Sequence, residues 1–276
     1  MIWITFRAVT VAAALLCAAP SASRAGEAVD LALILAVDVS GSVDMEEARL
    51  QRDGYIAAFN DSEVIEAIAN GFLGKIAVTY FEWAGYGYNK HTIDWTVIDG
   101  AESAKAFAAR LSKQPYHSAR GTSISEAILW SIPAFDRSGV ETRRRVVDIS
   151  GDGANNSGPS VITARDKAVA AGITINGLPI LSSYGSFGYY SQGANLDLYY
   201  ERCVIGGRNS FVIAANGFEH FANAIRQKLV LEISGREPDP SAMREARAKR
   251  QEKTGGFIRV SERPPYIMPC DMPAFN

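Results

Sequence analysis

The sequence predicts an α/β protein with a doubly wound, mostly parallel central sheet, one antiparallel edge strand and helices on both faces. Strand-like apolar runs alternate along the chain with segments of helical periodicity, an order that is typical of parallel sheets covered by helices. The first run, at 31–37, is continuously apolar, as expected for a strand that is buried on both faces. A Gly-rich turn at 84–89 separates two further strand-like runs and predicts the antiparallel pair.

The expected elements follow one another without an internal repeat. An amphipathic helix is expected at 43–59, because apolar residues recur there among charged ones. The helix expected at 159–171 has Pro159 near its first turn and Gly172 as its stop signal. Further helices are expected at 101–111, 123–135 and 218–231, and further strands at 75–83, 91–98, 143–149, 173–180 and 209–214. One domain is therefore expected over 27–234.

The two ends of the chain differ from this domain. Residues 1–25 have a basic start at Arg7, a short apolar run and a small-residue exit at Ala25, which together predict a cleaved signal peptide. Residues 235–276 are first rich in charge and then rich in proline, and we expect them to form a C-terminal extension. No apolar run of about eighteen residues follows residue 25, so no transmembrane segment is expected.

Composition limits the class of function. The 276 residues are 47% hydrophobic, which supports a large core and excludes a disordered chain. The formal net charge of −2 argues against a nucleic-acid partner, which would require a basic excess. Loss of the signal peptide would leave two cysteines in an oxidising compartment, where such pairs are usually bridged. We therefore expect an exported protein, periplasmic or secreted, with a disulfide between Cys203 and Cys270.

Three loops carry candidate metal ligands. The first directly follows the buried strand and contains Asp38, Ser40 and Ser42 at alternating positions. Thr122 lies in a loop before a helix, and Asp152 follows the strand expected at 143–149. Because the loops after parallel strands meet at one edge of the sheet, we expect these five side chains to converge.

The chemistry of the five side chains suits a hard divalent cation. All of them offer oxygen, the ligand atom that Mg²⁺ prefers, with Mn²⁺ or Ca²⁺ as alternatives. Three of the five are neutral hydroxyls, which leave much of the charge of the cation unneutralised. The sequence thus predicts that the cation recruits one further anionic oxygen, an Asp or Glu carboxylate of a partner protein. The alternative is that Asp38 and the two serines merely cap the following helix, a role that these residue types favour.

At these residues the chain resembles a von Willebrand factor type A domain. The pattern Asp38-x-Ser40-x-Ser42, with Thr122 and Asp152, matches the metal-ion-dependent adhesion site of that family. The segments LALILAVDVSGSVD, GTSISEAI, VVDISGDGANN and CVIGGRNSFV resemble an uncharacterised branch of exported bacterial proteins with this fold. The resemblance covers about 28–234. The resemblance implies that four residues lie in or next to the first coordination shell of the metal, namely Asp38, Ser40, Ser42 and Thr122. It also implies that Asp152 lies near the metal.

An enzymatic function is not expected. An aspartyl phosphatase would need Asp-x-Asp after the first strand, and Ser40 stands in place of the second acid. The segment 153–160 has the glycine spacing of a phosphate loop, but Pro159 replaces its lysine. A Mg²⁺-dependent phosphate-ester hydrolase and a scaffold with a purely structural metal remain as alternatives to the adhesion module.

Two aromatic clusters in expected loops are candidates for a partner-binding rim around the cation. Tyrosine offers a large contact area at low entropic cost. The alternative is that these loops pack on themselves. The first cluster comprises Trp83, Tyr86 and Tyr88, and the second comprises Tyr184, Phe187, Tyr189 and Tyr190.

Overall fold

The structure is a computed structural model that describes residues 26–181, 195–239, 241 and 269–271. The expected signal peptide, at 1–25, and most of the expected extension, at 235–276, lie outside the described residues. Among the described residues, no helix combines the length and the apolar character that crossing a membrane requires.

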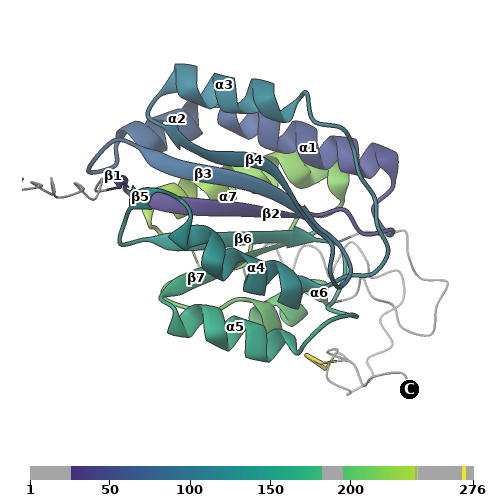
Figure 1. Ribbon diagram of the computed structural model, residues 1–276. Coiled ribbons are helices and arrows are strands. Elements are labelled where there is room, and N and C mark those ends of the chain that lie inside the picture. Colours follow the sequence, from purple (N-terminus) through teal and green to yellow (C-terminus); the bar gives the residue numbers. More distant parts are fainter. Residues whose placement is uncertain (1–25, 182–194, 240, 242–268, 272–276) are drawn as a thin grey trace, which may run out of the picture.

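A five-stranded sheet in the order β4-β3-β2-β6-β7 forms the centre of the molecule (Figure 1). β2, β3, β6 and β7 run parallel, and β4 pairs antiparallel with β3 at one edge. The predicted fold class, a mostly parallel sheet with one antiparallel edge strand, is confirmed. The strands are β2 (Leu31–Asp38), β3 (Ile76–Trp83), β4 (Asn89–Ile98), β6 (Arg145–Gly151) and β7 (Ile173–Pro179).

Helices cover both faces of the sheet, and each face has its own apolar cluster. One face carries α1 (Met45–Phe59), α2 (Ser62–Ala69), α3 (Ala101–Leu111) and α7 (Phe221–Ser234). The other face carries α4 (Ile124–Asp136), α5 (Val161–Ala170) and the short α6 (Leu196–Tyr199), which continues into a π-helical turn at Tyr200–Val204.

The central strand β2 explains this layering. All eight of its residues are buried, and their side chains alternate between the two clusters. Leu31, Leu33 and Leu35 pack under α1 and α7, while Ala32 and Ile34 pack under α4. The last residue of such a strand, and the loop after it, lie at the C-terminal end of the parallel strands, where the following helices begin.

The expected strand at 209–214 does not form. The segment makes only isolated bridges to β7, such as the one between Gly177 and Val212. The reason is a competing side-chain contact and one unsuitable dihedral angle, because the backbone N–H of Phe211 donates to the side-chain oxygen of Asn176 (3.1 Å) and Asn209 has a positive φ of 57°. A regular ladder requires backbone partners and extended dihedrals at these positions.

Several short elements were not expected from the sequence. α2 follows α1 after two residues, with Asp61 as its N-cap accepting from the backbone N–H of Glu63 (2.8 Å). A small parallel pair joins β1 (Glu27–Ala28) to β5 (Val140–Glu141) beside the start of the main sheet. A 3₁₀ turn at Phe218–His220 precedes α7, so the expected closing helix starts three residues late.

Cys203 and Cys270 form a disulfide, the pairing that the sequence predicts. It holds the described residues 269–271 against the body of the domain. Asp271 accepts hydrogen bonds from the hydroxyl of Ser160 (2.8 Å) and the backbone N–H of Val161 (3.0 Å), at the start of α5. The C-terminal region therefore takes part in capping a helix of the domain.

Candidate metal centre

The predicted ligands lie where the parallel strands end. Asp38 is the last residue of β2, Asp152 follows β6 directly, and Thr122 lies two residues before α4. β2 and β6 are hydrogen-bonded neighbours, so their C-terminal ends lie next to each other. The loop after β2 is joined to the loop before α4, because the backbone N–H of Ala119 donates to the carbonyl of Val39 (3.0 Å).

Hydrogen bonds connect the side chains of the first and third loops. The backbone N–H of Ser40 donates to Asp38 Oδ1 (2.7 Å), which turns the loop back on the strand. The hydroxyl oxygens of Ser40 and Ser42 are 2.9 Å apart, and Ser42 Oγ donates to Asp152 Oδ1 (2.7 Å). Residues that are 110 positions apart in the sequence thus form one continuous polar cluster.

The environment of Asp38 disfavours its charged form. Its side chain is fully buried, and Oδ2 has no hydrogen-bond partner. Burial, and secondarily the nearby carboxylate of Asp152, raise the pKa of Asp38 well above its ordinary value. Burial also raises the pKa of Asp152. Two acids that oppose each other's ionisation in this way are stabilised by a cation between them.

Asn156, in the same loop as Asp152, holds Thr122 beside that loop. The backbone N–H of Thr122 donates to Asn156 Oδ1 (2.8 Å), and the backbone N–H of Asn156 donates to the carbonyl of Thr122 (2.9 Å). A Cβ atom at Gly153 would lie 3.6 Å from Thr122 Oγ1, so this hydroxyl lies against the residue next to Asp152. The structure therefore brings all five predicted residues to one edge.

Gly151 allows the third loop to approach the buried carboxylate. A Cβ atom at this position would lie 2.8 Å from Asp38 Oδ2 and 3.0 Å from the hydroxyl oxygen of Tyr200. Contacts of this length are too short for a side chain, so the glycine is required by space. The Tyr200 hydroxyl is buried without a hydrogen-bond partner, and burial together with the charge of Asp38 raises its pKa.

The residues present fit a hard divalent cation. A buried carboxylate oxygen without a donor, a second carboxylate and three hydroxyls make an all-oxygen set, which suits Mg²⁺, Mn²⁺ or Ca²⁺. No group of three or more His, Cys, Asp or Glu side chains suited to a metal occurs among the described residues, so hydroxyls would have to complete the shell.

Helix capping does not account for the cluster. The N-cap of α1 is Asp44, whose side chain accepts from the backbone N–H groups of Glu46 and Glu47 (2.8 Å each). Glu47 in turn accepts from the backbone N–H of Asp44 (2.9 Å), which completes a capping box. Asp38, Ser40 and Ser42 therefore remain available for another role.

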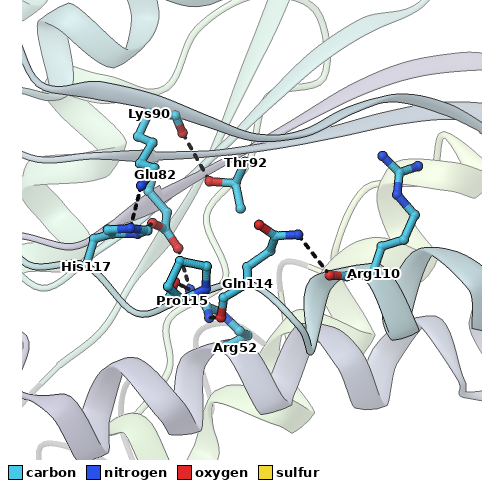
Figure 2. Close-up of polar contacts among 8 residues, drawn as sticks. All are labelled: Arg52, Glu82, Lys90, Thr92, Arg110, Gln114, Pro115 and His117. Carbon is cyan, nitrogen blue, oxygen red and sulfur yellow. Dashed lines mark hydrogen bonds and ion pairs between the residues drawn. The ribbon is translucent and has the colours of Figure 1, made fainter.

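A buried ionic cluster that the sequence did not reveal supports the segment leading to Thr122 (Figure 2). Glu82, on β3, is fully buried and receives Arg52 of α1 (2.6 Å) and His117 (2.8 Å) on its two carboxylate oxygens. Arg52 also donates to the carbonyls of Gln114 (2.6 Å) and Pro115 (3.1 Å). One acid thus ties α1, β3 and the loop at 112–122 together, and sequence spacing alone gave no signal for this contact.

Asn155 and Tyr199 are further supporting residues that sequence reasoning did not single out. Asn155 Oδ1 accepts from the backbone N–H of Ser125 (3.0 Å), which joins the third loop to α4. The backbone N–H of Asn155 donates to the hydroxyl of Tyr199 (3.2 Å), which donates to the carbonyl of Cys270 (3.1 Å). The disulfide-linked segment is thus connected to the loop of Asp152. The Asn-Asn pair after Gly-Asp-Gly was the available signal.

The aromatic rim is only partly as expected. Trp83 is fully buried in the core below α4, so its assignment to a contact rim was wrong. Tyr86 is 70% exposed, and its backbone N–H donates to Ser157 Oγ (3.2 Å) in the loop of Asp152. Tyr88 is partly exposed in the same hairpin. The second cluster, Tyr184, Phe187, Tyr189 and Tyr190, lies outside the described residues.

Comparison with solved structures gives the class of the fold. The chain is similar to proximal thread matrix protein 1 from the mussel byssus, with 14% identity and a TM-score of 0.53, over 76% of this chain and 48% of that one. A form of the same mussel protein with a zinc-occupied MIDAS motif matches with 16% identity and a TM-score of 0.53, over 76% of this chain and 50% of that one. The pilus adhesin SpaC from Lactobacillus rhamnosus GG, in an open conformation, matches with 13% identity and a TM-score of 0.54, over 76% of this chain and 31% of that one.

These likenesses establish the fold, and the fold is that of a von Willebrand factor type A domain. The chain spans about half or less of the length of these solved proteins. At the level of family, residues 28–237 match the model of DUF1194, described as a protein of unknown function, and the chain belongs to that family. No curated protein matches the sequence.

Proposed function

We propose that this protein is an exported module that binds a divalent cation at Asp38, Ser40, Ser42, Thr122 and Asp152 and uses it to bind a partner protein. In this proposal the cation is Mg²⁺, with Mn²⁺ or Ca²⁺ as substitutes. The partner contributes an Asp or Glu carboxylate to the cation. The chain itself catalyses no reaction.

The observation that carries the proposal is Asp38 Oδ2. It is a carboxylate oxygen buried without a donor, at the end of the central strand and next to a second carboxylate. A buried polar atom without a partner is costly, and such atoms are rare unless a ligand uses them. A divalent cation would satisfy this oxygen and remove the repulsion between Asp38 and Asp152.

The balance of charge supports recruitment of an outside ligand. Ser40, Ser42 and Thr122 contribute no charge, and Asp152 already accepts a hydrogen bond from Ser42. Ser42 is exposed, so the cluster opens to solvent on one side. A carboxylate is the commonest anionic oxygen on a protein surface, and a partly neutralised cation binds it directly.

The surroundings of the cluster suit a protein partner. The hairpin with Tyr86 and Tyr88 stands beside the loop of Asp152, and Tyr86 presents most of its ring to solvent. An exposed tyrosine next to a charged anchor is a typical contact residue. The zinc-occupied MIDAS motif of the mussel protein and the adhesin role named for SpaC are consistent with this proposal.

Export is supported by the covalent structure. The disulfide between Cys203 and Cys270 would be stable in the periplasm or outside the cell, where thiols are not kept reduced. The signal-peptide pattern at 1–25 points to the same compartment.

The test is capture of partners from envelope extract with and without a chelator, using wild-type protein, Asp38→Asn and Tyr86→Ala. Partners should bind wild-type protein in Mg²⁺ and be lost with chelator or with Asp38→Asn. Tyr86→Ala should keep the stabilisation by metal and lose partners. The matched control is Asp53→Asn, which removes an exposed carboxylate from α1 and should behave as wild type.

The alternatives predict other outcomes. A scaffold with a structural metal would be stabilised by Mg²⁺ and would bind the same proteins with and without chelator. A phosphate-ester hydrolase would turn over generic phosphate esters with Mg²⁺. The histidines whose contacts are described, His117 and His220, bind Glu82 and Asn216 rather than the five ligands, which disfavours a histidine as general base.

A further inference from the structure

A cavity lies at the end of the sheet opposite to the metal centre. It has a volume of about 420 Å³ and is formed by the first residues of β6 and β7 and the last turn of α7. This is within the size range of about 300–1,000 Å³ that small-molecule sites occupy. Its most distinctive feature is its charge, because five arginines line it: Arg143, Arg144, Arg145, Arg208 and Arg236.

One of these arginines belongs to the framework of the cavity. Arg144 donates to the carbonyls of Glu232 and Ile233 at the end of α7, with 2.9 Å to the latter. It thereby satisfies helix carbonyls that would otherwise face the cavity. Arg144 is partly buried, and this burial lowers its pKa. Arg144 therefore forms part of the cavity wall, and its positive charge lies at the C-terminal, negative end of the α7 dipole.

The other arginines are not neutralised by acids of the cavity wall. Glu232 is the only acidic residue among the described residues that line the cavity. Glu232 is buried, and its side chain pairs with Lys228 (2.5 Å), which also contacts Asp148 (2.7 Å), so this carboxylate is engaged inside the core. Arg145 has a distant, exposed partner in Asp136 (3.8 Å).

Arg143 and Arg208 are exposed, and no hydrogen bond or ion pair joins either side chain to another of the described residues. They approach the cavity from segments that are 65 positions apart in the sequence, and Arg236 reaches it from beyond α7. Guanidinium groups gathered on a concave surface repel one another and concentrate a positive potential there. A bound anion is the natural compensation.

We propose that this cavity is a binding site for a phosphate group carried by a larger molecule. Arginines from three segments surround it, which fits a tetrahedral group with several acceptor oxygens better than a planar carboxylate with two. The volume exceeds the need of a bare ion, so the phosphate would be part of a headgroup or of a small phosphorylated metabolite.

An exposed apolar loop lies at the same end of the sheet. Phe72 is 97% exposed, and the next residue, Leu73, donates its backbone N–H to Asp30 (2.9 Å) just before β2. The backbone N–H of Ala32, two residues after Asp30, donates to the carbonyl of Arg144 (2.9 Å), which places this loop at the same end of the sheet as the cavity. A membrane phospholipid would use both features, whereas a soluble phosphate ester would use the cavity alone.

The experiment measures binding in the presence of chelator, so that a cation at the first site cannot hold the phosphate. Calorimetry with inorganic phosphate and glycerol 3-phosphate tests the soluble source. Flotation with vesicles of phosphatidylglycerol, compared with vesicles of phosphatidylcholine, tests the lipid source. The variant is Arg143→Gln with Arg208→Gln, and the control is Arg49→Gln with Lys113→Gln, which removes the same charge from exposed positions elsewhere.

Wild-type protein and the control pair should bind at least one probe, with affinity that falls as salt increases. The Arg143/Arg208 variant should bind that probe at least about tenfold more weakly, since charge-assisted hydrogen bonds are lost. Asp38→Asn should bind as wild type, which separates this site from the metal centre. Absence of binding to every probe would overturn the proposal, and so would equal weakening in both charge pairs. An unchanged melting temperature of the two charge-pair variants shows that they are folded.

Discussion

Replacement of Asp38 by Asn should have opposite effects on stability with and without metal. In the metal-free protein, burial and Asp152 raise the pKa of Asp38, so folding at neutral pH must either bury a charge or take up a proton. Both cost free energy. Asparagine keeps the oxygen that accepts from the backbone N–H of Ser40 and removes the ionisable group, so the metal-free variant should be more stable than wild type.

The size of both effects can be estimated. A buried, unsatisfied charged oxygen costs ~2 kcal/mol or more, which is the expected gain of Asp38→Asn in chelator. A ligand present at 1,000 times its dissociation constant adds about 4 kcal/mol to the unfolding free energy of wild type. For a domain of this size, 1 kcal/mol corresponds to about 2–4 °C in Tm. Wild type should therefore gain roughly 8–16 °C with metal, and the order of the two proteins should invert.

The assay is thermal unfolding at pH 7.5 with chelator and with increasing Mg²⁺, Mn²⁺ or Ca²⁺. Asp53→Asn serves as the control and should follow wild type under all conditions. The reasoning is refuted if Asp38→Asn is less stable than wild type in chelator. It is equally refuted if the variant gains as much stability from metal as wild type does.

Three further perturbations test other parts of the structure. Replacing Cys203 and Cys270 by serine opens a loop of 67 residues and should lower the unfolding free energy by about 4 kcal/mol in urea titrations; a loss below 1 kcal/mol would contradict this. Burial raises the pKa of Asp148 to about 7, so the folded protein binds the extra proton, and this contribution to stability is lost as pH rises from about 4 to about 7. Asp148→Asn should therefore flatten the fall in stability between about pH 4 and about pH 7, and an unchanged slope would disprove the assignment. Glu82→Gln leaves Arg52 buried without its counter-charge, which should cost ~3 kcal/mol and weaken Mg²⁺ binding; unchanged urea midpoints and affinity would argue against the cluster's supporting role.

Local patterns were sufficient for the framework of the fold. The apolar run ending at Asp38 identified the central strand, because a strand covered on both faces needs no polar positions. The Gly-rich turn before β4 identified the antiparallel edge. The same patterns failed at 209–214, where the side chain of Asn176 takes the backbone donor that a strand would use. A competing contact from a distant segment is invisible in the local sequence.

The candidate site shows the same division. The types and order of the five oxygen-bearing residues, from Asp38 to Asp152, could be read from the sequence, because each follows a strand or precedes a helix. The assignment of Trp83 to the rim was wrong, because helices cover both faces of β3 and every residue of this strand, including Trp83 at its end, is buried.

Residue types, their spacing and their position relative to the strands are properties of the chain itself, and they were enough to predict a doubly wound sheet with a cluster of oxygen ligands at one edge. Tertiary structure alone decided that Asp38 is buried with one oxygen unsatisfied. It also decided that Glu82 pairs with Arg52 and His117, and that five arginines line a cavity at the opposite end of the strands. The reason is that burial, charge coupling and cavity shape depend on distances between segments that are far apart in the sequence.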